Sequence, residues 1–167
     1  LINPFPFALL SNDAKNDELT VMPAFSWMYN MYALARNNWK FANRDQRIFK
    51  VQNIEFDTFA PDSMEEAIQA RKLLEVWTAK AYLRSKGEYK NEIEERELRV
   101  LGNKLLNGDQ KVVDALEILG EGMEKSKRKV RILKAYKSYH AYGDMIMHYA
   151  IKNALKWLED NPEETFQ

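Results

Sequence analysis

The sequence predicts an all-α fold, a bundle of about five helices preceded by a short extended N-terminal segment. Three observations lead to this prediction. Long stretches lack proline and glycine, their apolar residues recur every three or four positions, and no set of strands that could form a ladder is evident. With 167 residues, of which 46% are hydrophobic, the chain is long enough to bury one core without disulfides. We therefore predict a single helical domain.

The N-terminal segment differs from the rest of the chain because it holds three of the five prolines, Pro4, Pro6 and Pro23. Proline lacks a backbone donor and disfavours helix in the residue that precedes it. We predict extended chain and turns over residues 1–23, with a short strand near 7–10.

Helical periodicity and capping signals define the remaining elements. Ser63 begins a capping-box pattern that opens the second helix, and Gly87 ends that helix. Asp109 is suited to cap the fourth helix. The five predicted helices span 24–42 with an extension toward 49, 63–86, 91–107, 110–120 and 129–159. The resulting divisions of the chain are an extended segment at 1–23, a helical bundle domain at 24–160 and a tail at 161–167.

Charge and composition argue against several classes of function. Lysine plus arginine equals aspartate plus glutamate, 25 of each, so no net field attracts nucleic acid or an acidic membrane. Cysteine is absent, which removes disulfides and thiolate chemistry. No run of 18 apolar residues or secretory signal is present. We expect a cytoplasmic protein without membrane contact and, because the sequence starts at Leu1, a segment of a longer protein.

Motifs that would support catalysis are weak. The serines lie in no GxSxG elbow, and no glycine-rich phosphate loop is present. The acidic run at 88–97 is interspersed with lysine and arginine, which is typical of a solvated helix face. We predict no catalytic residue and no cofactor in this segment, although the parent protein could be an enzyme.

One alternative is an α-helical, metal-dependent enzyme that uses His140, Asp144 and His148. These residues follow at four-residue steps and share one helix face. The outer two lie about 12 Å apart at 1.5 Å per residue, so all three cannot converge on one ion. No Glu-x-x-His pair of a dinuclear site is present. The favoured interpretation is a partly buried polar stripe, and no metal ligand is predicted.

Four candidate ligand-binding residues, Asn30, Tyr32, Arg36 and Asn37, lie in the stretch WMYNMYALARNNWK. Arginine and amides interleaved with aromatic residues are what carboxylate, phosphate and sugar sites use. An ordinary amphipathic helix is the competing interpretation.

A second candidate group is the basic cluster Lys125, Lys127, Arg128 and Lys129, in GMEKSKRKVRILKAY. Such a cluster could hold a phosphate-bearing ligand in a salt-dependent way. The alternative is ion pairing with the chain's own carboxylates, for example those at 88–97. Both interpretations stay open at the level of sequence.

Several stretches together resemble a known family. They are FPFALLSN, VMPAFSWMYNMYALARNNWKFANRDQR, LGNKLLNGDQ and EGMEKSKRKVRILKAYKSYHAYGDMIMHYAIKNAL. The chain resembles the C-terminal helical region of a family of long bacterial proteins of unknown function, whose central region is similar to hexapeptide-repeat transferases. The chain itself lacks aliphatic residues at six-residue spacing, so no active-site residue can be transferred to it.

The resemblance implies a left-handed β-helix upstream, with FPFALL at its end and the helices packed on it or on a neighbouring subunit. Hexapeptide proteins are commonly trimers, so a homo-oligomer, such as a trimer, is implied. The leading hypothesis is a non-catalytic helical accessory module that terminates a transferase-like scaffold. The alternatives are a phosphate- or nucleotide-binding module and the metal-dependent enzyme.

Overall fold

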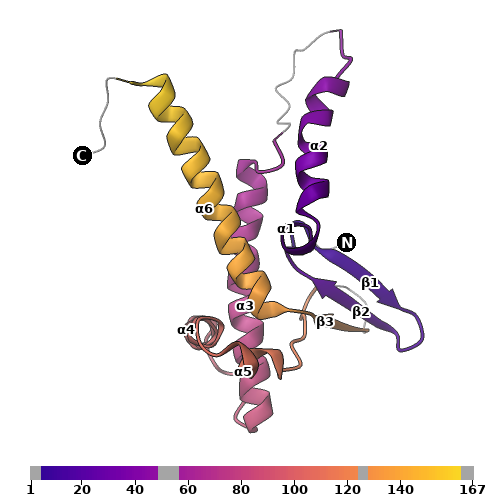
Figure 1. Cartoon of the computed structure of the whole chain (residues 1–167). Helices are drawn as coiled ribbons and strands as arrows, with labels where there is room; N and C mark the ends of the chain where they lie inside the picture. The colour runs from indigo at the N-terminus through magenta and orange to yellow at the C-terminus, as the bar shows by residue number, and fades with distance from the viewer. Residues whose placement is uncertain (1–4, 49–56, 124–127, 163–167) are drawn as a thin grey trace.

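The computed structural model describes residues 5–48, 57–123 and 128–162 (Figure 1). The described residues form six helices and one three-stranded sheet. The strands are β1 (Leu9–Asp13), β2 (Glu18–Met22) and β3 (Lys129–Ile132), and the helices are α1 (Phe25–Tyr29), α2 (Met31–Arg44), α3 (Pro61–Lys86), α4 (Glu95–Leu106), α5 (Gln110–Asp114) and α6 (Ala135–Asp160).

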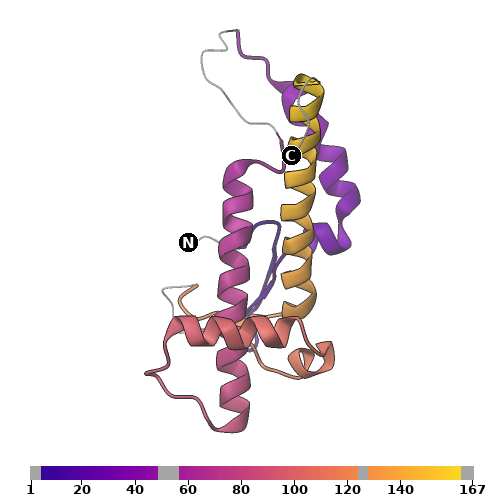
Figure 2. The same ribbon diagram turned by 90° about the vertical axis from the view of Figure 1, so that its left-hand side faces the viewer.

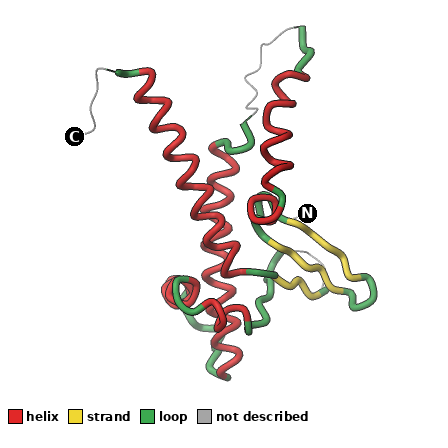
Figure 3. The backbone as a smooth tube through the Cα atoms, viewed as in Figure 1, coloured by secondary structure: helices red, strands yellow, loops and turns green. Residues whose placement is uncertain are grey.

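The predicted all-α fold is wrong, because the chain has an α/β fold. Its sheet is mixed, in the order β1-β2-β3: β1 and β2 pair antiparallel, and β2 and β3 pair parallel. The strands lie together on one side of the long helices (Figure 3).

The hairpin of β1 and β2 forms because the turn between them is stabilised by its own side chains. The carboxylate of Asp13 accepts hydrogen bonds from the backbone N–H groups of Lys15 at 3.0 Å and Asn16 at 3.2 Å, as in an Asx turn. In β2, Leu19 and Val21 are buried and alternate with partly exposed residues, which is the period of a strand. The strand predicted near 7–10 overlaps β1 only at residues 9 and 10, the first two residues of β1.

Strand β3 occupies the residues that were predicted to begin the last helix. Val130 and Ile132 are buried at alternate positions and lie opposite Leu19 and Val21 of β2. Lys134 then adopts a left-handed conformation with φ of 56°, and α6 begins only at the next residue. The apolar residues Val130 and Ile132 therefore follow the two-residue period of a strand and not the period of a helix.

The segment that follows α5 covers the outer edge of β3. The N–H of Ile132 donates to the carbonyl of Ile118 at 2.9 Å, and the N–H of Gly120 donates to the carbonyl of Val130 at 2.9 Å. This role in the sheet explains why the helix predicted for 110–120 ends at Asp114. The helix predicted for 24–42 is likewise interrupted, because α1 and α2 are separate helices that meet at Asn30.

Three helix-end signals acted largely as predicted. Gly87 ends α3 with φ of 72°, and the side chain of Asp109 accepts from the N–H of Lys111 at 2.9 Å at the start of α5. Helix α3 begins two residues early, with Pro61 in its first turn, where a missing N–H costs nothing. Ser63 still serves the cap, because its Oγ accepts from the N–H of Ala60 at 3.0 Å.

The core forms where α3, α6 and the sheet meet, and α4 crosses α3 beside it (Figure 2). The crossing of α3 and α4 is close because Gly102 lies against the backbone of Glu75. A Cβ at position 102 would stand 1.9 Å from the carbonyl oxygen of Glu75. Only glycine fits this contact.

Tyr142 of α6 fastens the N-terminal segment to the helices. Its buried hydroxyl accepts from the N–H of Ala24 at 3.1 Å and donates to the carbonyl of Pro6 at 2.8 Å. Burial raises the pKa of Tyr142 well above its ordinary value, so the hydroxyl stays protonated and able to donate. The hydroxyl of Ser138, also in α6, donates a hydrogen bond to the carbonyl of Pro23 at 2.8 Å.

Candidate functional site

A groove of about 570 Å³ lies between α1 and α6. Its walls are rich in aromatic side chains, and its lysine, histidine and aspartate all come from one side of α6, where residues three or four apart align. The lining residues are Trp27, Met28 and Tyr29 from α1 and Tyr136, Lys137, His140, Ala141 and Asp144 from α6. The groove is shallow and largely open to solvent, so a small ligand would lie on it with one side exposed.

The end of α4 fixes the orientation of His140 in this groove. Its Nε2 lies 2.8 Å from the carbonyl oxygen of Leu106. Because a carbonyl only accepts, Nε2 donates its hydrogen to Leu106, and Nδ1 is the ring nitrogen that this contact leaves for another partner. The ring of Tyr136 lies 4.7 Å from that of His140, and the Tyr136 hydroxyl reaches the carbonyl of Gly108 at 3.4 Å.

Lys137 and Asp144 place opposite charges near the two ends of the groove. They are seven residues apart on α6, which corresponds to about 10 Å. Both are exposed, and neither side chain has a hydrogen-bond or ion-pair partner among the residues that the structure describes. Their charges are therefore open to a ligand.

A buried polar network joins α3, α4 and α6. Glu75, which is 7% exposed, accepts from the Tyr139 hydroxyl at 2.9 Å, from Asn103 Nδ2 at 3.2 Å and from Arg99 Nε at 3.0 Å. The guanidinium of Arg71 lies 4.2 Å from the centre of the Tyr139 ring. Both carboxylate oxygens of Glu75 therefore have donors, and the residue links the three helices.

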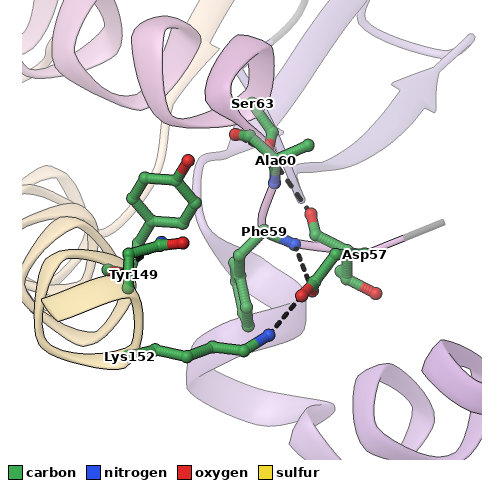
Figure 4. Close-up of polar contacts among 8 residues, drawn as sticks. Asp57, Phe59, Ala60, Ser63, Tyr149 and Lys152 are labelled. Carbon is green, nitrogen blue, oxygen red and sulfur yellow. Dashed lines mark hydrogen bonds and ion pairs between the residues drawn. The ribbon is translucent and has the colours of Figure 1, made fainter. Parts of the chain in front are cut away.

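A second polar contact ties the chain before α3 to α6 (Figure 4). The carboxylate of Asp57 accepts from Lys152 Nζ and, at 3.1 Å, from the N–H of Phe59. Burial alone would raise the pKa of Asp57, but these two hydrogen bonds and the nearby charges of Lys152 and His148 together lower it. The ring of Phe59 also packs edge-on against His148, with the centres 5.6 Å apart.

The geometry separates the residues of the metal hypothesis. His140 is bonded to the end of α4, whereas His148 packs against Trp27 and Phe59, whose rings also contact each other. Within the described ranges, no group of three or more histidine, aspartate or glutamate side chains is placed to hold a metal ion.

The predicted binding residues near position 30 lie at the end of α1 and along α2. Asn30 is the C-cap of α1, and Tyr32, Arg36 and Asn37 are exposed on α2. Tyr29 of the neighbouring groove lies beside them in sequence. Helix α1 lies between α2 and the sheet (Figure 1), so these residues do not converge with β3.

In the predicted basic cluster, Lys125 and Lys127 lie outside the described residues. Arg128 donates to the side chain of Asn12 at 2.6 Å, and Lys129 pairs with Glu117. The hydrogen bond and charge of Lys129 lower the pKa of Glu117. For Lys129, the carboxylate is supplied by the chain itself, from a position outside the acidic run at 88–97.

Sequence reasoning missed most of the groove. Its signal was partly visible, because His140 and Asp144 belonged to the stripe that we considered as a metal site and interpreted as a partly buried polar face, but Tyr136 and Lys137 were not joined to it. The aromatic wall on α1 was hidden by the prediction of one continuous helix. The turn at Asn30 separates α1 from α2, and no glycine or proline near it indicates a break in the helix.

Helices α2 and α6 both leave apolar side chains uncovered. Helix α2 and the C-terminal half of α6 both extend beyond the sheet and α4 (Figure 1). We call their exposed apolar residues the projecting surface. It consists of Met31 (42% exposed) and Tyr32 (75%) in the first turn of α2, and of Met147 (61%), Ile151 (52%), Leu155 (55%) and Trp157 (42%) from the middle of α6 onward.

Comparison with known proteins finds one informative similarity. The chain is 33% identical over 162 residues to an uncharacterised protein of Treponema pallidum (strain Nichols), a match that covers 93% of the chain and 20% of that relative. The chain thus spans about a fifth of the relative's length. No family model and no solved structure matches. The predicted similarity to a protein of unknown function is supported, but the hexapeptide-repeat parent gains no support.

None of the helices in the described part of the chain is both long enough and apolar enough to cross a lipid bilayer. The longest, α3 and α6, have 26 residues each but carry charged residues throughout.

Proposed function

We propose that this chain is a non-catalytic assembly module that docks, through its projecting surface, onto another folded part of a longer protein. The observation that carries the proposal is the spacing on α6. Met147, Ile151 and Leu155 follow at four-residue steps, so they form one continuous apolar stripe, and each is more than half exposed. Burial of such side chains against a partner is strongly favourable.

The position of the stripe supports a docking role. In the first half of α6 the apolar residues Tyr139, Tyr142 and Met145 are fully buried in the core. Further along, Ile146 and Tyr149 still pack on the core on one side, whereas Met147, Ile151 and Leu155 face outward on another, and the helix continues without a break to Asp160. Exposed contiguous apolar surface is uncommon in monomers and marks interaction sites.

The length of the relative indicates what docks on the projecting surface. A match that covers 20% of the Treponema pallidum protein leaves four fifths of that chain outside the aligned segment. A neighbouring region of the same polypeptide is present at high effective concentration. We therefore assign the docking partner to the longer chain, and oligomerisation, including a trimer, to that larger assembly.

Separation of the relative into two parts tests this proposal. The segment that matches this chain and the remainder would be expressed separately, mixed and analysed by sedimentation velocity. We expect a complex, which should be lost when the position aligned with Ile151 is changed to aspartate and kept when that aligned with Lys156 is changed. Independent sedimentation of the two parts would refute the docking role.

A further inference from the structure

We propose that the groove between α1 and α6 binds a nucleoside monophosphate. The base would stack on the aromatic walls, the phosphate would meet Lys137, and Asp144 would accept hydrogen bonds from the other end of the ligand. This inference goes beyond the assembly role, because its residues lie outside the projecting surface and the two can fail separately.

The walls suit a flat, unsaturated ring. Trp27 and Tyr29 come from α1, whereas Tyr136 comes from α6, so aromatic surface is presented from both sides of the groove. Stacking of a nucleobase on an aromatic side chain contributes about 1–3 kcal/mol per base. The volume of about 570 Å³ lies in the range of small-ligand pockets.

The polar groups match the two ends of a nucleotide. The ammonium of Lys137 offers three donors to phosphate oxygens. The carboxylate of Asp144, about 10 Å further along α6, can only accept when ionised, so it selects ribose hydroxyls or the N–H groups of a base. Neither side chain has a partner in the described part of the chain, so a ligand would displace no existing ion pair.

His140 adds a ring nitrogen of fixed orientation between the two charges. It lies one turn from each, three residues after Lys137 and four before Asp144. Its Nε2 hydrogen is occupied by the carbonyl of Leu106, which leaves Nδ1 as the atom available to a ligand hydroxyl. The contact with Tyr136 holds the ring in place before a ligand arrives.

The charge balance favours a free mononucleotide over a nucleic-acid strand. The formal net charge of the chain is zero, and Lys137 is the one lysine among the groove's lining residues. A strand of RNA or DNA would need several cations along its phosphates.

Titration calorimetry with AMP and adenosine tests the assignment. We expect saturable AMP binding that Lys137→Glu weakens at least tenfold, while adenosine binding changes less than threefold. Asp144→Asn should weaken both ligands. Lys156→Glu, an exposed substitution elsewhere on α6, and Lys129→Glu, in the basic cluster, should leave both unchanged. Circular dichroism would confirm that the variants are folded.

Three results would overturn the proposal. The first is no saturable binding of AMP up to about 1 mM, which corresponds to about −4 kcal/mol. The second is AMP binding that Lys129→Glu abolishes and Lys137→Glu does not change, which would place the phosphate at the basic cluster. The third is tighter binding of an adenosine oligonucleotide than of AMP, which would indicate a strand-binding surface.

Discussion

The two ends of the molecule use similar apolar sequences in opposite ways. At the end that holds the sheet, the apolar faces of α3, α4 and the first half of α6 are buried against one another. Toward its C-terminal end, α6 carries Met147, Ile151 and Leu155 at the same helical spacing but exposes them, and α2 exposes Met31 and Tyr32 in its first turn. Periodicity thus shows which side of a helix is apolar, whereas the topology decides whether another element covers it. We interpret the first end as a scaffold and the second as a docking surface.

The largest expected effect is at the crossing of α3 and α4. Gly102→Ala would place a methyl group 1.9 Å from the carbonyl oxygen of Glu75, and backbone cannot yield as a flexible side chain can. We expect a loss of about 3 kcal/mol in the free energy of unfolding, at the upper end of overpacking costs. Urea denaturation measures it. Val100→Ala, on the exposed side of the same helix, should change little, and equal losses in the two variants would contradict the close crossing.

The buried network around Glu75 should show the next largest effect. Tyr139→Phe removes a hydroxyl that contacts both Glu75 and Asn103, and leaves buried polar groups with one partner fewer. We expect a loss of about 1–3 kcal/mol, measured by the same denaturation. Tyr32→Phe is the matched control on the projecting surface, and its effect should be within about 0.5 kcal/mol. A Tyr139→Phe variant as stable as this control would show that the network does not stabilise the scaffold.

Acid should weaken the contacts that hold segments onto the scaffold. Burial acts to raise the pKa of Glu121, but its ion pairs with Lys80 and Arg84 lower the value overall, and the pKa of Asp57 is lowered in the same sense. A carboxyl whose pKa is lower in the folded state binds protons more tightly when unfolded. Its stabilisation is complete above the reference values, 3.8 for aspartate and 4.5 for glutamate, and is lost as the pH falls below them.

Thermal unfolding measured from pH 6 to pH 3 checks this expectation. The range extends about one pH unit or more on either side of the two reference pKa values. Lys152→Met should flatten the pH dependence, because Asp57 then loses its partner. Since both groups are partly exposed, each contribution should be below about 1 kcal/mol. An unchanged pH profile in Lys152→Met would show that the contact in Figure 4 contributes nothing to stability.

The smallest expected effect concerns the projecting surface. Ile151→Ser changes a side chain that is 52% exposed, so the unfolding free energy of the isolated chain should shift by no more than about 0.5 kcal/mol. The same polar substitution at Leu74, which is fully buried, should be strongly destabilising. A large loss from Ile151→Ser would mean that this half of α6 is already packed, and that the contrast between the two ends is wrong.

Long helices could be predicted from the sequence because each has many apolar residues at helical spacing and a clear signal at one end. Gly87 and Asp109 acted as expected for this reason. The strands could not, because β3 offers only Val130 and Ile132 as evidence, and these positions fit a helix start equally well. Its identity as a strand depends on Leu19 and Val21, more than one hundred residues earlier.

In the candidate site too, the features encoded within one helix could be predicted, and those that depend on distant segments could not. The polar face of α6 could be recognised, because His140 and Asp144 are four residues apart in one helix. The opposite wall could not, since nothing local places Trp27 against α6. That contact depends on the hairpin and on the anchoring of Ala24 by Tyr142.

Amide hydrogen exchange on the Treponema pallidum relative, in full length and as the matching segment alone, tests the docking role most directly. In the isolated segment, amides aligned with the second half of α6 should exchange faster than those aligned with α3, because an uncovered helix end opens more readily. In the full-length protein we expect the same amides to become strongly protected, with little change in α3. Equal exchange of the α6 end in both forms would contradict the assignment of this surface to docking.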